Sequence, residues 1–370
     1  MGTKRVMLAV AGAGKTYHIC HAIDPGKKNL LIAFTHANIE NFRNELIRAY
    51  GCVPELTTLI TFHSFIYRFF ILPFESTIRE YFSSPYFRSQ GVSLMSPPDQ
   101  WVKGKVNPSY KTKDKLEHYI NHRNCYYCDC FSELVLQIKK GRKNKKDFCS
   151  LLRKGAQNLN LFFDEIWVDE FQDFRNYDYD FLLQLSKELN QITLIGDYYQ
   201  HSVSGKKTCG KPFAKQAKVI GYQDFISHLR KESFEIDTTT LQASRRCSDD
   251  VCEFVKKKLG INIMSQGVNV GRVIVDQSLA EQLINDDNII KLVYKNAQNK
   301  AFKACNWSYS KGNTYDHVCV ILTKDFEKID EDDFDSAGIS PLTINKLYVA
   351  LTRTRGDLYL VKQSALNAIQ

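Results

Sequence analysis

Short hydrophobic runs recur along the first 200 residues, separated by stretches with helical spacing. Each run has the length of a buried strand and is too short for a helix of ordinary size. Buried strands that alternate with helices are typical of a parallel sheet covered on both faces. The pattern therefore predicts an α/β fold. The runs are Val6–Val10, Leu30–Phe34, Thr57–Phe62, Ile166–Val168 and Ile192–Ile195.

The alternation is interrupted once and then resumes. Between about residues 75 and 155 a basic, aromatic segment replaces it, and we predict a mostly helical insertion there. From about residue 234 new strand and helix signals follow, so we predict a first lobe over 1–233 that contains the insertion and a second lobe over 234–370. These later signals are Thr239–Leu241, Val251–Leu259, Ile289–Tyr294, Val318–Leu322 and Leu358–Val361.

Composition narrows the class of protein. The 370 residues are 44% hydrophobic and 25% charged, as in ordinary folded soluble proteins. We expect no membrane association, because no leader is apparent and no apolar stretch reaches the roughly 18 residues of a membrane span. The 11 cysteines are irregularly spaced, which favours reduced thiols in the cytoplasm over a disulfide framework.

The positive charge is concentrated in one segment. The formal net charge is +9, and residues 103–154 alone hold 14 Lys and Arg against 5 Asp and Glu. Aromatic residues such as Trp101 and Tyr110 are interleaved with these charges. Basic side chains neutralise phosphates and aromatic rings stack on bases, so the segment predicts a nucleic-acid surface that includes Lys140, Arg142 and Lys143. A solvated basic face is the alternative.

A glycine-rich loop follows the first predicted strand and precedes a predicted helix. Glycines allow backbone N–H groups to turn toward phosphates, and the start of a helix favours anions. Lys15 is expected to reach the β- and γ-phosphates, and the Thr16 hydroxyl is expected to bind Mg²⁺. The predicted nucleotide-binding loop is Ala11, Gly12, Ala13, Gly14, Lys15 and Thr16.

Two adjacent carboxylates follow the strand at Ile166–Val168. At a strand end, Asp169 can hold Mg²⁺ while Glu170 orients and deprotonates an attacking water. Together with the glycine-rich loop, this pair predicts hydrolysis of a nucleoside triphosphate.

The chain then resembles the UvrD/Rep-like superfamily 1 helicases. Asp169–Asp173 is similar to motif II of that family, and further segments follow in the family's order. They are Phe34–Ala37 (motif Ia), Thr61–Phe65 (Ib), Gly196–Gln200 (III), Leu241–Ser248 (IV), Ser310–Asp316 (V) and Leu347–Arg355 (VI). The resemblance implies two RecA-like lobes, ATP and Mg²⁺.

The resemblance also implies roles for single residues. Gln200 would sense the γ-phosphate, and Arg246 and Arg353 would act as arginine fingers. Phe34, Thr35 and His63 would contact DNA.

The sequence departs from the family at the nucleotide base. Arg245 stands where the family has a stacking tyrosine, and we expect it to contact the nucleotide. No upstream glutamine motif precedes the first strand. We therefore expect weak discrimination between bases.

A Cys-rich stretch lies in the basic insertion. Cys125, Cys128 and Cys130 have a spacing that zinc accepts, with His118 and His122 just upstream. A second cysteine pair is missing, so ordinary reduced thiols are the favoured interpretation.

The leading prediction is a DNA-dependent ATPase and helicase, a 3′ to 5′ motor on single-stranded DNA or DNA ends. The alternative is a nucleotide-gated DNA-binding subunit that switches a partner such as a nuclease and does not unwind by itself. By resemblance, small helicases of this kind also occur in phage and in bacterial antiphage defence. A P-loop kinase or GTPase does not account for the arginines of motifs IV and VI.

Overall fold

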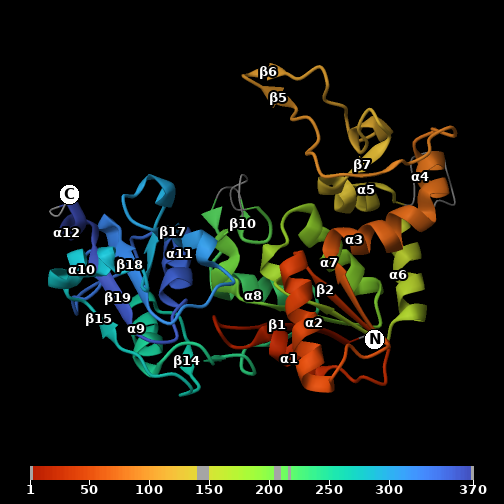
Figure 1. Ribbon diagram of the computed structural model, residues 1–370. Helices are drawn as coiled ribbons and strands as arrows, with labels where there is room; N and C mark the ends of the chain where they lie inside the picture. The colour runs from red at the N-terminus through yellow and green to blue at the C-terminus, as the bar shows by residue number, and fades with distance from the viewer. Residues whose placement is uncertain (1–2, 140–149, 204–209, 216–217, 368–370) are drawn as a thin grey trace. The chain divides into compact units, whose positions relative to one another are not determined.

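A computed structural model describes residues 3–139, 150–203, 210–215 and 218–367 (Figure 1). Strands pair in parallel within two larger sheets, which confirms the predicted α/β class and is consistent with RecA-like lobes. The chain divides into two compact units. Unit 1 holds residues 1–4, 19–169 and 174–193, and unit 2 holds 5–18, 170–173 and 194–370. Each unit combines three separate stretches of the chain, whereas the predicted lobes are continuous. The predicted lobe boundary at 233/234 therefore remains a prediction.

The first sheet has six strands in the order β12-β1-β9-β8-β2-β3. Every residue of β2 is buried, as its apolar run predicts. In unit 2 the Ala9 N–H donates to the Gly196 carbonyl. The glycine-rich loop that follows β1 therefore starts beside the end of β9. The strands are β1 (Thr3–Leu8), β2 (Asn29–Ala33), β3 (Thr57–Thr61), β8 (Glu165–Val168), β9 (Gln191–Gly196) and β12 (Glu235–Asp237).

The second sheet lies within unit 2 and has five strands in the order β15-β19-β18-β16-β17, all paired in parallel. Its central strand β18 is buried at every position because Val, Cys, Ile and Leu fill it. Trp307 is fully buried and donates its indole N–H to the Leu292 carbonyl at 3.0 Å. The strands are β15 (Val273–Ile274), β16 (Ile290–Val293), β17 (Ala304–Asn306), β18 (Val318–Leu322) and β19 (Leu358–Lys362).

Helices follow most of the strands. Capping residues fix both ends of two of them. The side chains of Thr35 and Ser248 cap the starts of α2 and α9, and Gly51 and Gly260 follow their last residues in the left-handed conformation. The longer helices are α1 (Lys15–Ala22), α2 (His36–Tyr50), α6 (Leu151–Phe162), α7 (Tyr177–Glu188), α8 (Tyr222–Lys231), α9 (Asp249–Leu259) and α11 (Pro341–Leu351). The shorter ones are α3 (Phe62–Ile66), α4 (Glu75–Tyr81), α5 (Phe131–Gln137), α10 (Ala280–Asn285) and α12 (Gln363–Asn367). Among the described residues, every helix is too short or too polar to cross a lipid bilayer.

The prediction of a mostly helical insertion is wrong for its middle part. Helices α4, α5 and α6 lie near its ends, but residues 82–130 contain short strands, loops and 3₁₀ turns. Pro85, Pro97, Pro98 and Pro108 explain the difference, because proline is excluded from helix interiors. The short strands are β4 (Gly91–Ser93), β5 (Trp101–Val102), β6 (Lys105–Val106) and β7 (Cys125–Tyr127).

Thr239–Leu241 also differs from its prediction as a strand. The Asp237 carboxylate accepts hydrogen bonds from the backbone N–H and the hydroxyl of both Thr239 and Thr240. These local bonds form a turn that ends β12. The next strand, β13 (Ala243–Ser244), pairs with β14 (Met264–Ser265), and β10 (Ala214–Lys215) pairs with β11 (Lys218–Val219).

Candidate active site

The loop between β1 and α1 has the backbone of a phosphate-binding turn. Gly12 and Gly14 have φ angles of 73° and 80°, in the left-handed region that glycine adopts at little cost. A Cβ atom on Gly12 would lie 2.6 Å from the Ser244 hydroxyl and 2.7 Å from Arg246 Cβ. Helix α1 begins at Lys15, and a helix start directs backbone N–H groups toward a bound anion. This geometry is compatible with the predicted nucleotide-binding loop, which stays a prediction.

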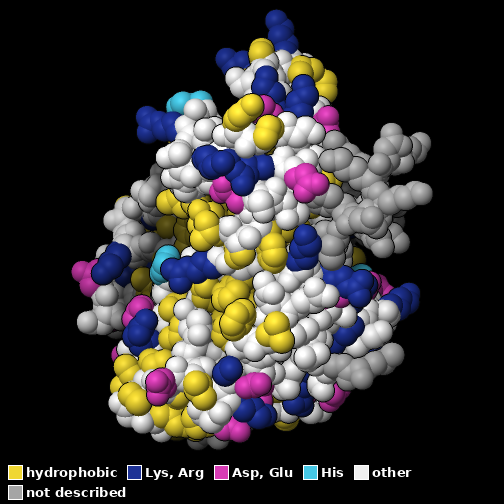
Figure 2. Space-filling model, turned by 90° about the vertical axis from the view of Figure 1, so that its right-hand side faces the viewer, with side chains coloured by type: hydrophobic (Ala, Val, Ile, Leu, Met, Phe, Trp, Pro, Cys, Tyr) yellow, Lys and Arg dark blue, Asp and Glu magenta, His cyan; other side chains and the backbone are white. Residues whose placement is uncertain are grey.

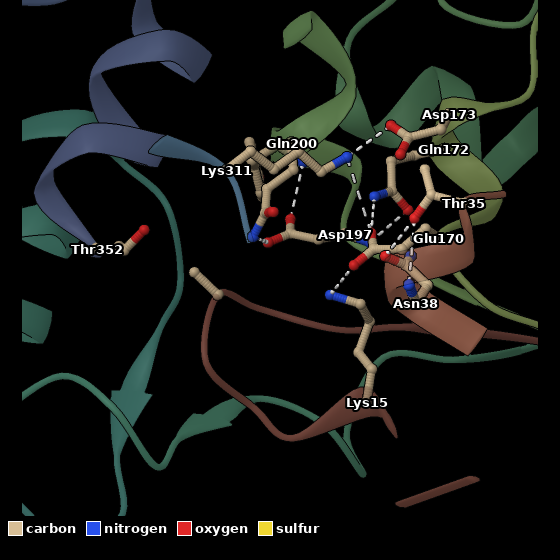
Figure 3. A network of polar contacts seen from close by, with 12 residues as sticks. Lys15, Thr35, Asn38, Glu170, Gln172, Asp173, Asp197, Gln200, Lys311 and Thr352 are labelled. Atoms are coloured by element: carbon tan, nitrogen blue, oxygen red, sulfur yellow. Dashed lines mark hydrogen bonds and ion pairs between the residues drawn. The ribbon is translucent and has the colours of Figure 1, made fainter. Parts of the chain in front are cut away.

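Glu170 lies between two lysines of unit 2 (Figure 3). Its carboxylate is 3.1 Å from Lys15 Nζ and 3.8 Å from Lys311 Nζ. Burial by itself would raise the pKa of Glu170, but Lys15, Lys311 and a hydrogen bond from Gln172 lower it to about 2. The carboxylate is therefore ionised at neutral pH. Glu170 also has a φ of 53°, an uncommon backbone conformation that is often found at functional sites.

Lys311 connects the motif V segment to the motif II segment. Its ammonium group is 2.6 Å from the Asp173 carboxylate, in addition to its contact with Glu170. The two carboxylates and the lysine are less than one quarter exposed, so this ion pair is less screened than a surface pair.

Hydrogen bonds continue from Glu170 to the predicted γ-phosphate sensor (Figure 3). The Gln172 side chain donates to Glu170 and accepts the Asp197 backbone N–H at 3.0 Å. Gln200 in turn donates to the Asp197 carboxylate at 2.8 Å. A Cβ atom on Gly196 would lie 2.2 Å from the Gln172 side-chain oxygen, so a glycine is required beside this connection.

Asp197 and Tyr348 form the buried centre of the site. The Tyr348 hydroxyl accepts the Ala11 backbone N–H at 2.7 Å and donates to Asp197 at 3.3 Å. Burial raises the pKa of Asp197 to about 6, although Lys15 and the hydrogen bond from Gln200 oppose this shift. The glycine-rich loop, motif III and motif VI are thus joined through two side chains.

Arg246 and Arg353 both contact Thr352. Arg246 donates to the Thr352 carbonyl at 3.1 Å, and Arg353 donates to the Thr352 hydroxyl at 3.3 Å. Arg353 is 1% exposed, and burial together with the charge of Arg246 lowers its pKa to about 10. The Arg353 guanidinium group is still protonated at neutral pH, because a pKa of 10 lies well above it.

Arg245 lies against the glycine-rich loop. Its guanidinium group is 4.0 Å from the centre of the Tyr17 ring, and its backbone N–H donates to the Gly12 carbonyl at 2.9 Å. A cation placed over an aromatic face is a favourable contact. The sequence identified Arg245 but gave no sign of Tyr17 as its partner.

Asp169 and Thr16 are the predicted Mg²⁺ ligands. Asp169 is 2% exposed and follows β8 directly, with its N–H bonded to the Ile32 carbonyl at 2.9 Å. Thr16 lies in the first turn of α1. A carboxylate and a hydroxyl supply the oxygen donors that Mg²⁺ prefers, so both residues fit the ion by their chemistry.

The predicted DNA contacts divide into two groups. Phe34 and His63, after β2 and at the start of α3 in unit 1, have ring centroids 5.7 Å apart, so motifs Ia and Ib meet. Thr35 is exposed and caps α2. Lys140, Arg142 and Lys143 lie outside the described residues.

Four residues of the site were not assigned a role from the sequence: Gln172, Asp197, Lys311 and Tyr348. All four fall inside the motif strings that carry the family resemblance. Their contacts join segments far apart in the chain, as with Ala11 and Tyr348, which are 337 residues apart. Spacing along the sequence cannot indicate such pairs.

The fold is that of an α/β protein with parallel sheets, and Glu170 lies beside Lys15 of the glycine-rich loop and beside Lys311. Residues 77–202 match the sequence profile of the UvrD/REP helicase N-terminal domain. This stretch contains motifs II and III, and the match confirms the resemblance to that family.

Solved helicase structures are also similar to the chain. One is described as the structure of PRRSV helicase, with 14% identity, a TM-score of 0.44 and coverage of 97% of this chain and 52% of that chain. Another is a complex of arterivirus nonstructural protein 10 (helicase) with DNA, with 14% identity, a TM-score of 0.43 and coverage of 96% and 60%. The chain thus spans little more than half the length of these helicases. No curated protein matches the sequence.

Proposed function

We propose that the protein hydrolyses ATP to drive movement along single-stranded DNA in the 3′ to 5′ direction. The observation that carries the proposal is the position of Glu170 between Lys15 and Lys311 in unit 2. The proximity of these groups supports a role for Glu170 as the base of hydrolysis and for Lys15 in phosphate binding. The family resemblance supplies the direction of movement.

The Lys15–Glu170 ion pair supports an ordered reaction. Triphosphate oxygens carry more negative charge than one carboxylate, so a bound nucleotide competes for the Lys15 ammonium group. Removing Lys15 from Glu170 takes away one of the interactions that lower the pKa of Glu170, which makes the carboxylate a stronger base. Glu170 then accepts a proton from the attacking water. Asp169 and Thr16 would each offer an oxygen donor to Mg²⁺, and the ion would offset phosphate charge.

Gln200, Arg246 and Arg353 complete the proposed site. The connection from Gln200 through Asp197 and Gln172 to Glu170 gives the γ-phosphate sensor a physical link to the base. The two arginines bring positive charge next to each other, and charge of this sign stabilises the transition state of phosphoryl transfer.

Selectivity for the base is proposed to be weak. Arg245 and Tyr17 offer flat surfaces, which stack on any base and do not read its edge. We expect kcat/KM for ATP, dATP and GTP to agree within about tenfold, or about 1.4 kcal/mol. A preference for ATP over GTP above about a hundredfold would contradict weak selectivity without affecting the proposed hydrolysis.

The β5–β6 hairpin is a proposed DNA contact in unit 1. Trp101 is 59% exposed, and Lys103 and Lys105 are exposed beside it. Figure 2 shows lysine and arginine side chains mixed with hydrophobic ones at the top of the view, the level at which Figure 1 shows the hairpin. Exposed aromatic rings among basic groups match the bases and phosphates of a single strand.

The decisive experiment combines hydrolysis with strand displacement. We expect single-stranded DNA to increase the ATP hydrolysis rate, and a duplex with a 3′ tail to be unwound in preference to one with a 5′ tail. DNA-stimulated hydrolysis without displacement of either duplex would favour the alternative of a nucleotide-gated subunit that switches a partner. Absence of ATP hydrolysis under all conditions would reject both.

A further inference from the structure

Three side chains of types that commonly bind metals lie close together in unit 1, within the basic insertion. The Nδ1 or Nε2 atom of His118, the Sγ atom of Cys130 and a carboxylate oxygen of Glu133 all lie within 4.8 Å of one another. The three residues are 9%, 3% and 8% exposed. These groups therefore meet in the interior, where polar side chains need partners.

Backbone pairing brings the three residues together. The Tyr127 N–H donates to the Tyr119 carbonyl at 2.9 Å, which aligns the segment after His118 with the segment before Cys130. Cys130 immediately precedes α5, and Glu133 lies in the first turn of that helix. Backbone hydrogen bonding and the start of α5 therefore bring the three side chains together.

The imidazole of His118 has the orientation of a metal ligand. Its Nδ1 atom is 2.6 Å from the Lys111 carbonyl, and Nε2 is 3.4 Å from the Glu133 carboxylate. A histidine that binds a metal through one nitrogen commonly donates its other N–H to a backbone carbonyl, which fixes the ring. Nε2 thus faces Glu133, and in the neutral ring that donates from Nδ1 it carries the lone pair that a cation would bind.

The donor types and their spacing fit zinc. Zinc bonds of about 2.0–2.3 Å place tetrahedral ligand atoms roughly 3.3–3.8 Å apart, so distances of up to 4.8 Å in the cluster need to shorten by at most about 1.5 Å. One nitrogen, one sulfur and one carboxylate oxygen favour zinc over Mg²⁺ or Ca²⁺, which prefer oxygen alone. Three protein ligands leave a fourth position for water.

We infer that His118, Cys130 and Glu133 form a zinc-binding site within the basic insertion. The other cysteines of the stretch are not part of it: the thiols of Cys125 and Cys128 donate to the Arg123 carbonyl and the Asp129 carboxylate, each at 3.7 Å. Without zinc, Lys113 supplies positive charge, with its Nζ atom 2.5 Å from Glu133. Zinc and the Lys113 ammonium group would compete for this carboxylate.

The test is zinc binding to the full chain, stripped of metal with a chelator and kept reduced. We expect one Zn²⁺ per chain in a competition titration with a chromogenic chelator, and Co²⁺ should give the absorption bands of a thiolate complex. Cys130→Ser should lower zinc affinity at least tenfold and abolish the thiolate band. The matched control Cys128→Ser should leave both unchanged.

A second variant separates metal binding from a folding defect. Lys113→Met removes the competing ammonium group, so its zinc affinity should exceed that of the parent protein. Misfolding cannot produce such a gain. The inference is overturned if the parent chain binds no stoichiometric zinc, or if Cys130→Ser binds it as tightly as the parent.

Discussion

At the scale of single residues, Lys15 and Glu170 form one ion pair but have different expected roles. Lys15→Ala should weaken ATP binding, because the phosphates lose an ammonium group. Glu170→Gln should keep ATP binding and lower turnover by about 10²–10⁴, the range typical of a lost general base. Equilibrium binding of labelled ATP and single-turnover hydrolysis would measure the two effects separately. Hydrolysis by Glu170→Gln at the parent rate would remove Glu170 from the site.

Asp197 predicts a pH dependence of stability. Its pKa is raised to about 6 in the folded protein, above the roughly 3.9 of an unfolded chain, because it is buried. The folded state therefore binds the proton more tightly, and this contribution to stability is present below about pH 4 and is lost as pH rises through about 6. Two pKa units correspond to about 3 kcal/mol.

Asp197→Asn removes this titration. The unfolding free energy of the variant relative to the parent should increase by about 3 kcal/mol between pH 4 and pH 7.5, as measured by urea denaturation at each pH. A constant difference across that range would show that Asp197 titrates normally in the folded protein.

At the scale of elements, the β5–β6 hairpin can be tested apart from the proposed site of hydrolysis. Lys103→Glu with Lys105→Glu should weaken single-strand binding and flatten its salt dependence, because each lost phosphate contact removes about 0.7 from the slope. Trp101→Ala should cost about 1–3 kcal/mol through lost stacking. Lys256→Glu with Lys324→Glu, which reverses two exposed charges of unit 2, provides the control. Equal effects of both double variants would indicate only a general charge effect.

At the scale of the whole molecule, hydrolysis is expected to need segments from both ends of the chain. Arg246→Ala and Arg353→Ala should each lower kcat by about 10³–10⁵ and leave nucleotide affinity nearly unchanged, since arginine fingers act on transition-state charge. The buried Arg353 must exchange its contacts with Val349 and Thr352 for phosphate oxygens. The exposed Arg272 provides a control substitution. Lost affinity with a normal kcat at saturation would indicate a structural role.

The sequence by itself determined the features that depend on neighbours in the chain. Apolar runs predicted the buried strands β2 and β18, because side chains of that kind have to leave water wherever they lie. The glycine-rich loop was predicted because Gly12 and Gly14 are needed for a local backbone conformation. The motif strings gave the family resemblance, which the match over residues 77–202 confirms.

Only the tertiary structure decided which distant residues meet. Lys311 reaches Glu170, and Tyr348 joins Ala11 to Asp197, through packing that no short-range pattern encodes. The metal cluster shows the same limit: Cys125, Cys128 and Cys130 have the zinc-like spacing, yet Cys130 meets His118 and Glu133 instead. Backbone pairing and the first turn of α5 place those side chains. Chemistry at a buried site follows from such placement, because the pKa of each group depends on its burial and on the charges beside it.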